Sequence, residues 1–322
     1  MSVLVYIEAA KGAVKKSSLE AASYGSALAK QMGTSCTAIA IGDASDEKLA
    51  ELGKVGVSKV LHARDSKLDN FTPAAYAKVL EEAMSRENAQ ILVLSHTNNG
   101  VAMASRLSIR LGAGQATNVV SLPDLSSGFV VKRGVFSGKA FSEVKITTDK
   151  KIIALKKNAY AVEQGEGSAT VEAFQVNLSD ADVNGAPKET QMTSGKRLLT
   201  EADKVVSGGR GMKGPENWYL IEDLADAIGA ATACSKPVAD VDWRPHYEHV
   251  GQTGITVSPN LYIAVGISGA IQHLAGVNSS KVIVVINKDP EAPFFKAADY
   301  GIVGDAFEVL PKLIERAKQL EH

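Results

Sequence analysis

Glycine and polar residues follow three apolar runs in the last third of the 322-residue chain. The run Leu261–Gly266 leads into a segment that contains Ser268 and Gly269. The run Val282–Ile286 leads into Asn287, and the run ending at Val303 leads into Gly304 and Asp305. In parallel sheets, ligands bind outside the carboxyl ends of the strands, so residues at these positions are candidates for a binding site.

The chemistry that these residues could perform is anion and nucleotide binding. A glycine between a strand and a helix lets backbone N–H groups approach a phosphate, and the helix N-terminus favours negative charge. Upstream, Arg210 lies among the glycines of Ser207–Gly211, where its guanidinium could bind a phosphate or a flat aromatic ring. Asp305 could bind a ribose hydroxyl. Together these residues predict a site for a dinucleotide-sized ligand.

Each of these residues also has an ordinary structural interpretation when it is taken alone. Asp305 alone is typical of a helix N-cap, Arg210 of a solvated charge, and His273 of a packed or capping side chain. Spacing does not distinguish FAD, NAD or ATP as the ligand. No GxxxxGK[ST] motif is present, so that fingerprint does not support ATP.

The first part of the chain offers less chemistry. Ser95–Gly100 follows an apolar run and opens a helical pattern, so it too could hold a phosphate. Within it, His96 is typical of a turn residue. Because there are no paired carboxylates, no nucleophile elbow and no catalytic triad pattern here, we interpret this part as scaffold.

The elements that must position these residues alternate between strands and helices. Up to Leu122, apolar runs alternate with amphipathic stretches, which predicts a mainly parallel sheet covered by helices. Three extended runs follow at Phe129–Phe136, Phe141–Thr147 and Lys151–Lys156, and short polar turns separate them. We expect these runs to form an added antiparallel meander.

The segment from Glu163 to Gly195 is polar and rich in Gly, Ser, Asp and Asn, so we interpret it as a linker. A second α/β alternation follows it. The sequence therefore predicts two α/β domains, residues 1–195 and 196–319, of which the second has a doubly wound, Rossmann-like sheet. Residues 320–322 are set aside as a possible tag remnant.

Composition excludes several classes of function. The formal net charge is −1, which leaves no electrostatic footprint for nucleic acid. No apolar run reaches the length of a membrane span, so we expect no membrane insertion. The two cysteines, Cys36 and Cys234, have no metal-ligand spacing, and no secretory signal opens the chain. A reducing, cytoplasmic compartment is the simplest interpretation.

Residues 260–308 closely resemble the signature of the electron-transfer flavoprotein α subunit. The matching sequence is NLYIAVGISGAIQHLAGVNSSKVIVVINKDPEAPFFKAADYGIVGDAFE. The resemblance extends to SGGRGMKGPENW and HVGQTGITVSP, and more weakly to NNGVAMASRLSIRLGAG and RGVFSGKAFSEVKI in the first domain. It implies a heterodimer in which the second domain of this chain holds FAD and the first domain packs with a β subunit.

The resemblance also implies which residues contact FAD. It places the hydroxyl of Thr253 near flavin N5 and His273 on the N1/C2 carbonyl side, where donors would stabilise the negative charge of a reduced flavin. The implied cofactor-binding residues are Arg210, Ser235, Lys236, Val250, Gly251, Gln252, Thr253, Ser268, Gly269, Ala270, Ile271, Gln272, His273, Asn287, Asp305 and Ala306. No catalytic residue or metal ligand is implied.

Two of these positions depart from the usual family pattern. The family usually has arginine directly after the serine at position 235, whereas this chain has Lys236. The charge is kept, but the planar guanidinium that stacks and forks is lost, so we expect a different flavin potential. The family often has leucine where this chain has Ala306, a change to which a backbone contact would be indifferent.

The function that the resemblance implies is a one-electron shuttle rather than an enzyme. It would take electrons from flavin dehydrogenases, such as the acyl-CoA dehydrogenases of fatty acid β-oxidation, and deliver them to a membrane quinone oxidoreductase. Two alternatives stay open: the α subunit of an electron-bifurcating flavoprotein that uses NADH, and an NAD-binding enzyme domain. The location would be the cytoplasm of a bacterium, or the mitochondrial matrix if a transit peptide was removed.

Overall fold

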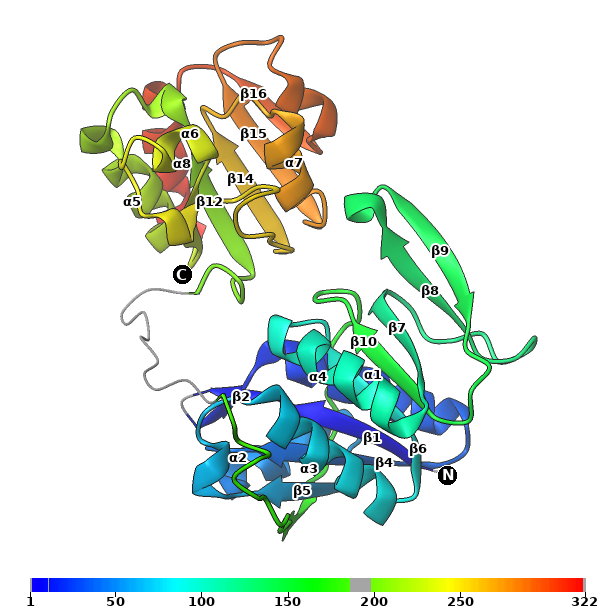
Figure 1. The fold of residues 1–322 in the computed structure, drawn as a ribbon. Coiled ribbons are helices and arrows are strands. Elements are labelled where there is room, and N and C mark those ends of the chain that lie inside the picture. The colour runs from blue at the N-terminus through cyan, green and yellow to red at the C-terminus, as the bar shows by residue number, and fades with distance from the viewer. Residues whose placement is uncertain (1, 11, 186–197, 321–322) are drawn as a thin grey trace. The chain divides into compact units, whose positions relative to one another are not determined.

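The computed structural model describes residues 2–10, 12–185 and 198–320 (Figure 1). Apart from the short segment Phe136–Lys139, one compact unit holds Met1–Gln191 and the other holds Met192–His322. The predicted domain boundary at residue 195 lies outside the described residues, as do residues 321–322 of the predicted tag remnant. Each unit contains its own sheet.

The first unit is built on a nine-stranded mixed sheet with the order β11-β5-β4-β1-β6-β10-β7-β8-β9. The strands from β11 to β7 are parallel, and β8 and β9 continue the sheet as an antiparallel hairpin. A separate small hairpin joins β2 (Ala9–Ala10) and β3 (Ala13–Val14). In chain order the nine strands are β1 (Ser2–Ile7), β4 (Ser35–Ile41), β5 (Lys59–Ala63), β6 (Ala89–Ser95), β7 (Gly114–Val119), β8 (Val130–Val135), β9 (Ala140–Lys145), β10 (Lys151–Leu155) and β11 (Thr170–Ala173).

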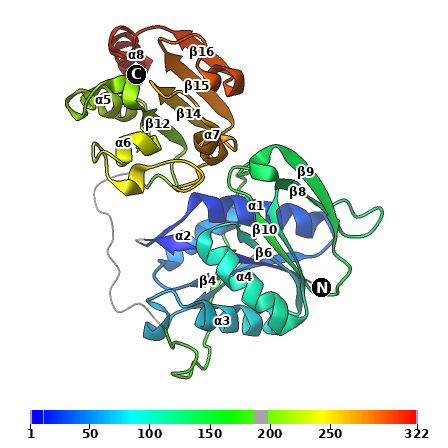
Figure 2. The ribbon, with the colours of Figure 1, turned by 45° about the horizontal axis from the view of Figure 1, so that its top comes forward.

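Helices cover both faces of this sheet (Figure 1, Figure 2). On one face, α1 (Lys16–Gln31) and α2 (Asp46–Ala50) pack in a core that includes Val3 and Val5 of β1. On the other, α3 (Pro73–Arg86) and α4 (Asn98–Leu111) pack in a core that includes Leu4. Neighbouring residues of β1 thus face opposite cores, as the two-residue period of a strand requires, and the strand is apolar throughout because both faces are covered.

Two predictions about the first unit are wrong in detail. The run at Lys151–Lys156 does not complete an antiparallel meander, because β10 lies between β6 and β7 and is parallel to both. Its buried residues Ile152–Leu155 suit a central strand that is covered on both faces. The segment from Glu163 onward is not only a linker, since β11 pairs with β5 and Phe174 is buried.

The second unit is a five-stranded parallel sheet with the order β13-β12-β14-β15-β16. In chain order these strands are β12 (Lys204–Gly208), β13 (Ala231–Cys234), β14 (Leu261–Val265), β15 (Val282–Asn287) and β16 (Tyr300–Val303). The spatial order is therefore 2-1-3-4-5, a doubly wound arrangement. The order in which the chain adds strands reverses between the parallel neighbours β12 and β14, and a crevice at the carboxyl ends of these two strands is the expected ligand site.

The helices of the second unit also lie on both sides of its sheet (Figure 1). On one face, α5 (Tyr219–Ala227), α6 (Lys236–Ala239) and α8 (Ala306–Leu320) share a core with Val206 and Val265. On the other, α7 (Ile271–Val277) and the segment that carries Val250 and Val257 share a core with Tyr262. The predicted fold class of two α/β units is thus confirmed. The strand β13 and the helix α6 were not predicted from the sequence.

Short 3-10 turns connect several of these elements. In the first unit they are η1 (Glu51–Val55) and η2 (Ser66–Leu68), and η3 (Phe136–Gly138) joins β8 to β9. In the second they are η4 (Arg210–Met212), η5 (Pro215–Asn217), η6 (His246–Glu248) and η7 (Pro293–Ala297). Among them, η4 starts two residues after β12 ends and so places Arg210 beside the switch point.

Candidate functional site

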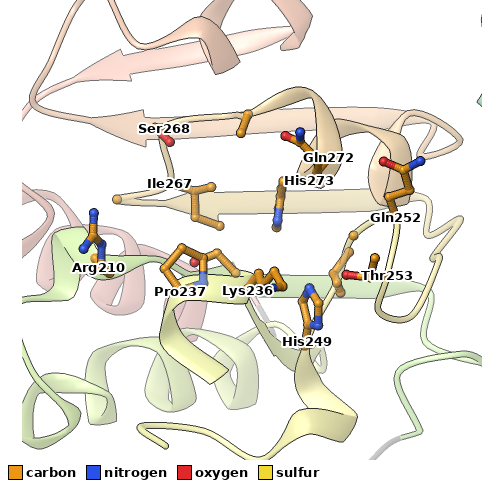
Figure 3. Close-up of a pocket in the computed structure, with 15 residues that line it drawn as sticks. Arg210, Lys236, Pro237, His249, Gln252, Thr253, Ile267, Ser268, Gln272 and His273 are labelled. Carbon is orange, nitrogen blue, oxygen red and sulfur yellow. The ribbon is translucent and has the colours of Figure 1, made fainter. Parts of the chain in front are cut away.

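A pocket of about 340 Å³ opens at the switch point of the second unit. This volume is within the range of small-molecule sites. Figure 3 shows Arg210 toward one end of the group of lining side chains and Gln252 and Thr253 toward the other. The lining residues are Arg210, Ser235, Lys236, Pro237, His249, Val250, Gly251, Gln252, Thr253, Gly266, Ile267, Ser268, Ala270, Gln272 and His273.

Three glycines allow the two central strands to end in close contact beside this pocket. The N–H of Gly209 donates to the carbonyl of Val265 at 2.8 Å, and the N–H of Gly211 donates to the carbonyl of Gly266 at 3.0 Å. A Cβ on Gly209 would lie 2.2 Å from the Gly266 oxygen, and Gly266 itself has a φ of +61°. A side chain at either position would separate the segments, so glycine is required here.

The turn Val250–Gly254 forms the opposite wall of the pocket and packs on α7. The N–H of Gln252 donates to the carbonyl of Gln272 at 2.7 Å. A Cβ on Gly276 would lie 2.6 Å from the Cα of Gly251, so the absence of that atom lets the turn approach the helix. The turn leaves the side chains of Gln252 and Thr253 exposed at the pocket.

His273 is held between the sheet and this turn. Its Nε2 lies 2.9 Å from the hydroxyl of the fully buried Tyr262. Its Nδ1 is buried and makes no hydrogen bond of normal geometry within the described part of the chain. Burial, with a smaller effect of nearby His249, lowers the pKa of His273 to about 4, although the backbone of Val250 acts in the opposite direction. The ring is therefore neutral at pH 7, and it has a polar atom that lacks a partner.

Two cations give the pocket positive charge. Arg210 is exposed at the end of β12, and no ion pair of its guanidinium occurs among the described residues. Lys236 is the first residue of α6, and its Nζ lies 3.2 Å from Asp240. The preceding Ser235 is buried where β13 leads into α6. Positive charge at Arg210 and Lys236 suits a ligand that carries phosphate groups or that gains negative charge when it is reduced.

Eleven of the sixteen predicted residues line the pocket, and the other five are not among its lining residues. Gly269 has a φ of +86° and packs on Phe294, and Ile271 is exposed on α7. Asn287 fixes the pocket wall, because its Nδ2 donates to the carbonyl of Ile267 at 3.0 Å. The Oδ1 of Asp305 accepts from the N–H of Phe307 at 3.0 Å, which is the geometry of an N-cap for α8. Ala306 is buried as the first residue of that helix.

Four lining residues were missed by the sequence analysis: Pro237, His249, Gly266 and Ile267. Gly266 and Ile267 lie within the quoted signature but were not selected as contacts. His249 and Pro237 belong to the part of the unit where β13 and α6 were not recognised. The sequence feature that could have identified His249 as a lining residue is its position directly before the predicted run Val250–Thr253.

A buried ionic cluster holds the segment that leads into the pocket turn. Arg244 donates to both carboxylate oxygens of Glu248, at 2.8 and 2.7 Å, and lies 2.9 Å from Glu222 of α5. Its guanidinium also lies over the ring of Trp218 at 5.7 Å. The side chains of Arg244 and Glu248 are only 14% and 4% exposed. Because water solvates them poorly, each charge needs the other to stabilise it. This cluster fixes the chain just before His249.

The first unit shows no comparable site at its candidate motif. The N–H of His96 donates to the carbonyl of Leu155 at 2.7 Å, and the Thr97 hydroxyl accepts from the N–H of Gly100 as the cap of α4. These contacts agree with the interpretation of His96 as a turn residue. Within the described ranges no group of His, Cys, Asp and Glu is arranged to hold a metal ion. Nor does any described helix combine the length and apolarity that crossing a bilayer requires.

The residues of the pocket fit a flavin dinucleotide. The pocket wall includes the start of α7, where backbone N–H groups favour phosphate. The exposed guanidinium of Arg210 is a group that a ligand would satisfy. The apolar Val250 and Ile267 provide contact area for a flat ring.

Comparisons with known proteins identify the same class of ligand. A family model described as "Electron transfer flavoprotein domain" matches residues 3–179, and one described as "Electron transfer flavoprotein FAD-binding domain" matches residues 198–278. A Bacillus subtilis protein named electron transfer flavoprotein subunit alpha is 41% identical over 88% of this chain and 87% of its own length. A Syntrophomonas wolfei protein of the same name is 37% identical over 98% of both chains. A Clostridium saccharobutylicum relative named Protein FixB is 34% identical over 99% of this chain and 96% of its own.

Proposed function

The chain belongs to the electron-transfer flavoprotein α-subunit family, and on that premise we propose that it is the electron-carrying subunit of a heterodimer with a β subunit. FAD is the cofactor of its second unit. The observation that carries the proposal is the pocket at the switch point. It lies where a dinucleotide is expected, and eleven of the residues implied by the family resemblance line it.

The residues of the pocket have separable roles in this proposal. FAD, when bound, supplies the electron-accepting and electron-donating chemistry. Arg210 and Lys236 provide positive charge, and Thr253 and His273 provide polar groups for the flavin ring. The apolar side chains of Val250, Ile267 and Pro237 exclude water from one part of the pocket. Exclusion of water lowers the local dielectric constant, which strengthens the effect of those charges on the flavin potential.

The proposed partners are proteins that donate and accept electrons. We propose flavin dehydrogenases, such as acyl-CoA dehydrogenases, as donors and a membrane quinone oxidoreductase as the acceptor. The near-neutral net charge of −1 is compatible with contacts to several folded proteins. The proposal places the complex in the cytoplasm, or in the mitochondrial matrix of a eukaryote.

The test is an anaerobic reductive titration of this chain purified together with its β subunit, with the FAD content measured in parallel. One FAD per heterodimer and reduction by an acyl-CoA dehydrogenase with its substrate are expected. Two FAD per heterodimer, or direct reduction by NADH, would instead assign the protein to the electron-bifurcating alternative. A purified complex without flavin would contradict the assignment of the pocket.

A further inference from the structure

His249 is a titratable side chain in the pocket for which the function proposed above has no role. It lines the pocket, and only 7% of the residue is exposed. Neither ring nitrogen has a hydrogen-bond partner among the residues that the structure describes. In the view of Figure 3 the ring is drawn between the labelled side chains of Lys236 and Thr253, which also line the pocket. Because these nitrogens are not among the fully buried side-chain atoms without a partner, they remain accessible, and an accessible unpaired imidazole that lines a pocket is a group that a ligand can engage.

The backbone around His249 fixes the position of this ring. Residue 249 pairs with Cys234 at the end of β13, and its carbonyl accepts the N–H of Ile255 at 2.8 Å. A Cβ on Gly254 would lie 2.8 Å from Nδ1, and a Cβ on Gly251 would lie 3.3 Å from Nε2. The two glycines of the turn therefore leave the space that the imidazole fills. The ring is held in place by packing, while its nitrogens stay unpaired.

Charged and titratable groups surround the ring from several elements. Asp240 and Lys236 contribute from α6, His246 from the turn η6, and His273 from α7. Burial is the largest influence and lowers the pKa of His249, Asp240 raises it, and Lys236 and His246 lower it. The imidazole is therefore neutral at pH 7, and it has an unpaired nitrogen that can accept a proton.

We propose that His249 is the proton acceptor of the flavin pocket, which takes up one proton from solvent when the bound cofactor gains an electron. The step balances, because the added electron stays on the cofactor and the proton forms an imidazolium ion. The net charge of the pocket is then unchanged by reduction. This proposal rests on the assignment of the pocket to FAD and adds a residue that couples electron transfer to pH.

The physical basis is the interaction between the new negative charge and the ring. A negative charge close to a poorly solvated imidazole favours its charged form, so reduction raises the pKa of His249. Linkage then requires that protonation of His249 stabilise the reduced state by the same amount. Between the pKa values of the oxidised and reduced states, each unit of pH changes the reduction equilibrium tenfold, which is about 59 mV for one electron.

The test compares the midpoint potential of the FAD-loaded heterodimer from pH 5 to 8 in three forms. These are the wild type, His249→Gln and the control His246→Gln, which removes a nearby exposed histidine that does not line the pocket. The potential of the flavin varies with pH by itself, so the measured quantity is the difference from wild type. We expect the His249→Gln difference to grow as the pH falls, toward the tenfold limit. The His246→Gln difference should be smaller at every pH, because His246 acts on the ring only through its charge.

A second measurement does not depend on a variant. Histidine-selective ¹⁵N NMR of the wild-type heterodimer gives the pKa of His249 in the oxidised and in the dithionite-reduced state. We expect a higher value in the reduced state, and an equal value in both states would overturn the proposal. Potentials of wild type and His249→Gln that stay parallel at every pH would overturn it as well. Failure of the complex to bind FAD would instead refute the proposed function.

Discussion

Lys236 begins α6, and its ammonium group is shared between the pocket and Asp240, which lies 3.2 Å away. We predict that Lys236→Arg raises the flavin midpoint potential, because a guanidinium can stack on the ring and keep a hydrogen bond to the carboxylate. The expected size is about 1 kcal/mol of added stability of the reduced state. Potentiometry of the heterodimer measures it, with Lys236→Gln expected to shift the potential downward. Equal potentials for lysine and arginine would contradict the prediction.

His273 links the stability of the second unit to pH. Burial lowers its pKa to about 4 in the folded protein, whereas the unfolded value is near 6.5. Folding therefore excludes a proton, so its contribution is fully present above pH 6.5 and is lost as the pH falls toward 4. We predict a loss of roughly 3 kcal/mol of unfolding free energy across this window.

The two tryptophans allow this loss to be measured. The chain has only Trp218 and Trp243, and both belong to the second unit, so their fluorescence reports its unfolding. Urea titrations of FAD-free protein at pH 7 and pH 4.5 give the difference. His273→Gln should show a smaller loss over the same range, because it lacks the titrating ring. A loss of equal size in both proteins would assign the pH dependence to other groups.

Among the elements of the second unit, the segment between α6 and β14 depends on the cluster around Arg244. We predict that Arg244→Ala destabilises the second unit by about 3–5 kcal/mol, since the buried Glu248 would lose its partner. FAD affinity should also fall, because the segment continues into His249 and the turn Val250–Gly254. Tryptophan-monitored urea unfolding and FAD titration measure the two effects.

The matched control for this prediction is Arg316→Ala on α8. That arginine is exposed, and the bond from its Nη1 to the side chain of Gln319 lies on the surface, so its removal should change the unfolding free energy by less than about 0.5 kcal/mol. If Arg244→Ala were equally mild, the cluster would not be what holds the pocket segment.

The elements differ in how well the sequence predicts them. The α/β alternation and most strands of both sheets could be read from apolar runs, since strands covered on both faces are apolar throughout. The order of the strands in the sheet could not be predicted in this way. The position of β10 depends on pairing with β6 and β7, which lie far away in the sequence. The strand β13 is short and rich in alanine, so it has no strong apolar pattern.

The candidate pocket residues and the elements around them were predicted by different arguments. The residues after β12 and β14 were predicted to bind a ligand because ligands bind at the carboxyl ends of parallel strands. No such rule applies to the residues Val250–Thr253, whose role in binding was predicted from the family resemblance alone. His249 was missed because its place in the pocket depends on pairing with β13 and on space left by Gly251 and Gly254.

At the scale of the whole molecule, the two units have separate sheets and separate cores. Residues in and around the pocket belong to the second unit alone. A ligand that binds only the folded form of one unit stabilises that unit and leaves an independent neighbour unchanged. The response to FAD can therefore separate the contributions of the two units.

We predict that calorimetry of the isolated chain shows two transitions and that FAD raises the temperature of only one of them. At a free FAD concentration of 100 times Kd, the second unit should gain about 2.7 kcal/mol. Tryptophan fluorescence identifies this transition, because Trp218 and Trp243 both lie in the second unit. Arg244→Ala should lower the same transition and leave the other in place. A single transition, or an equal shift of both by FAD, would show that the units unfold as one cooperative body despite their separate cores.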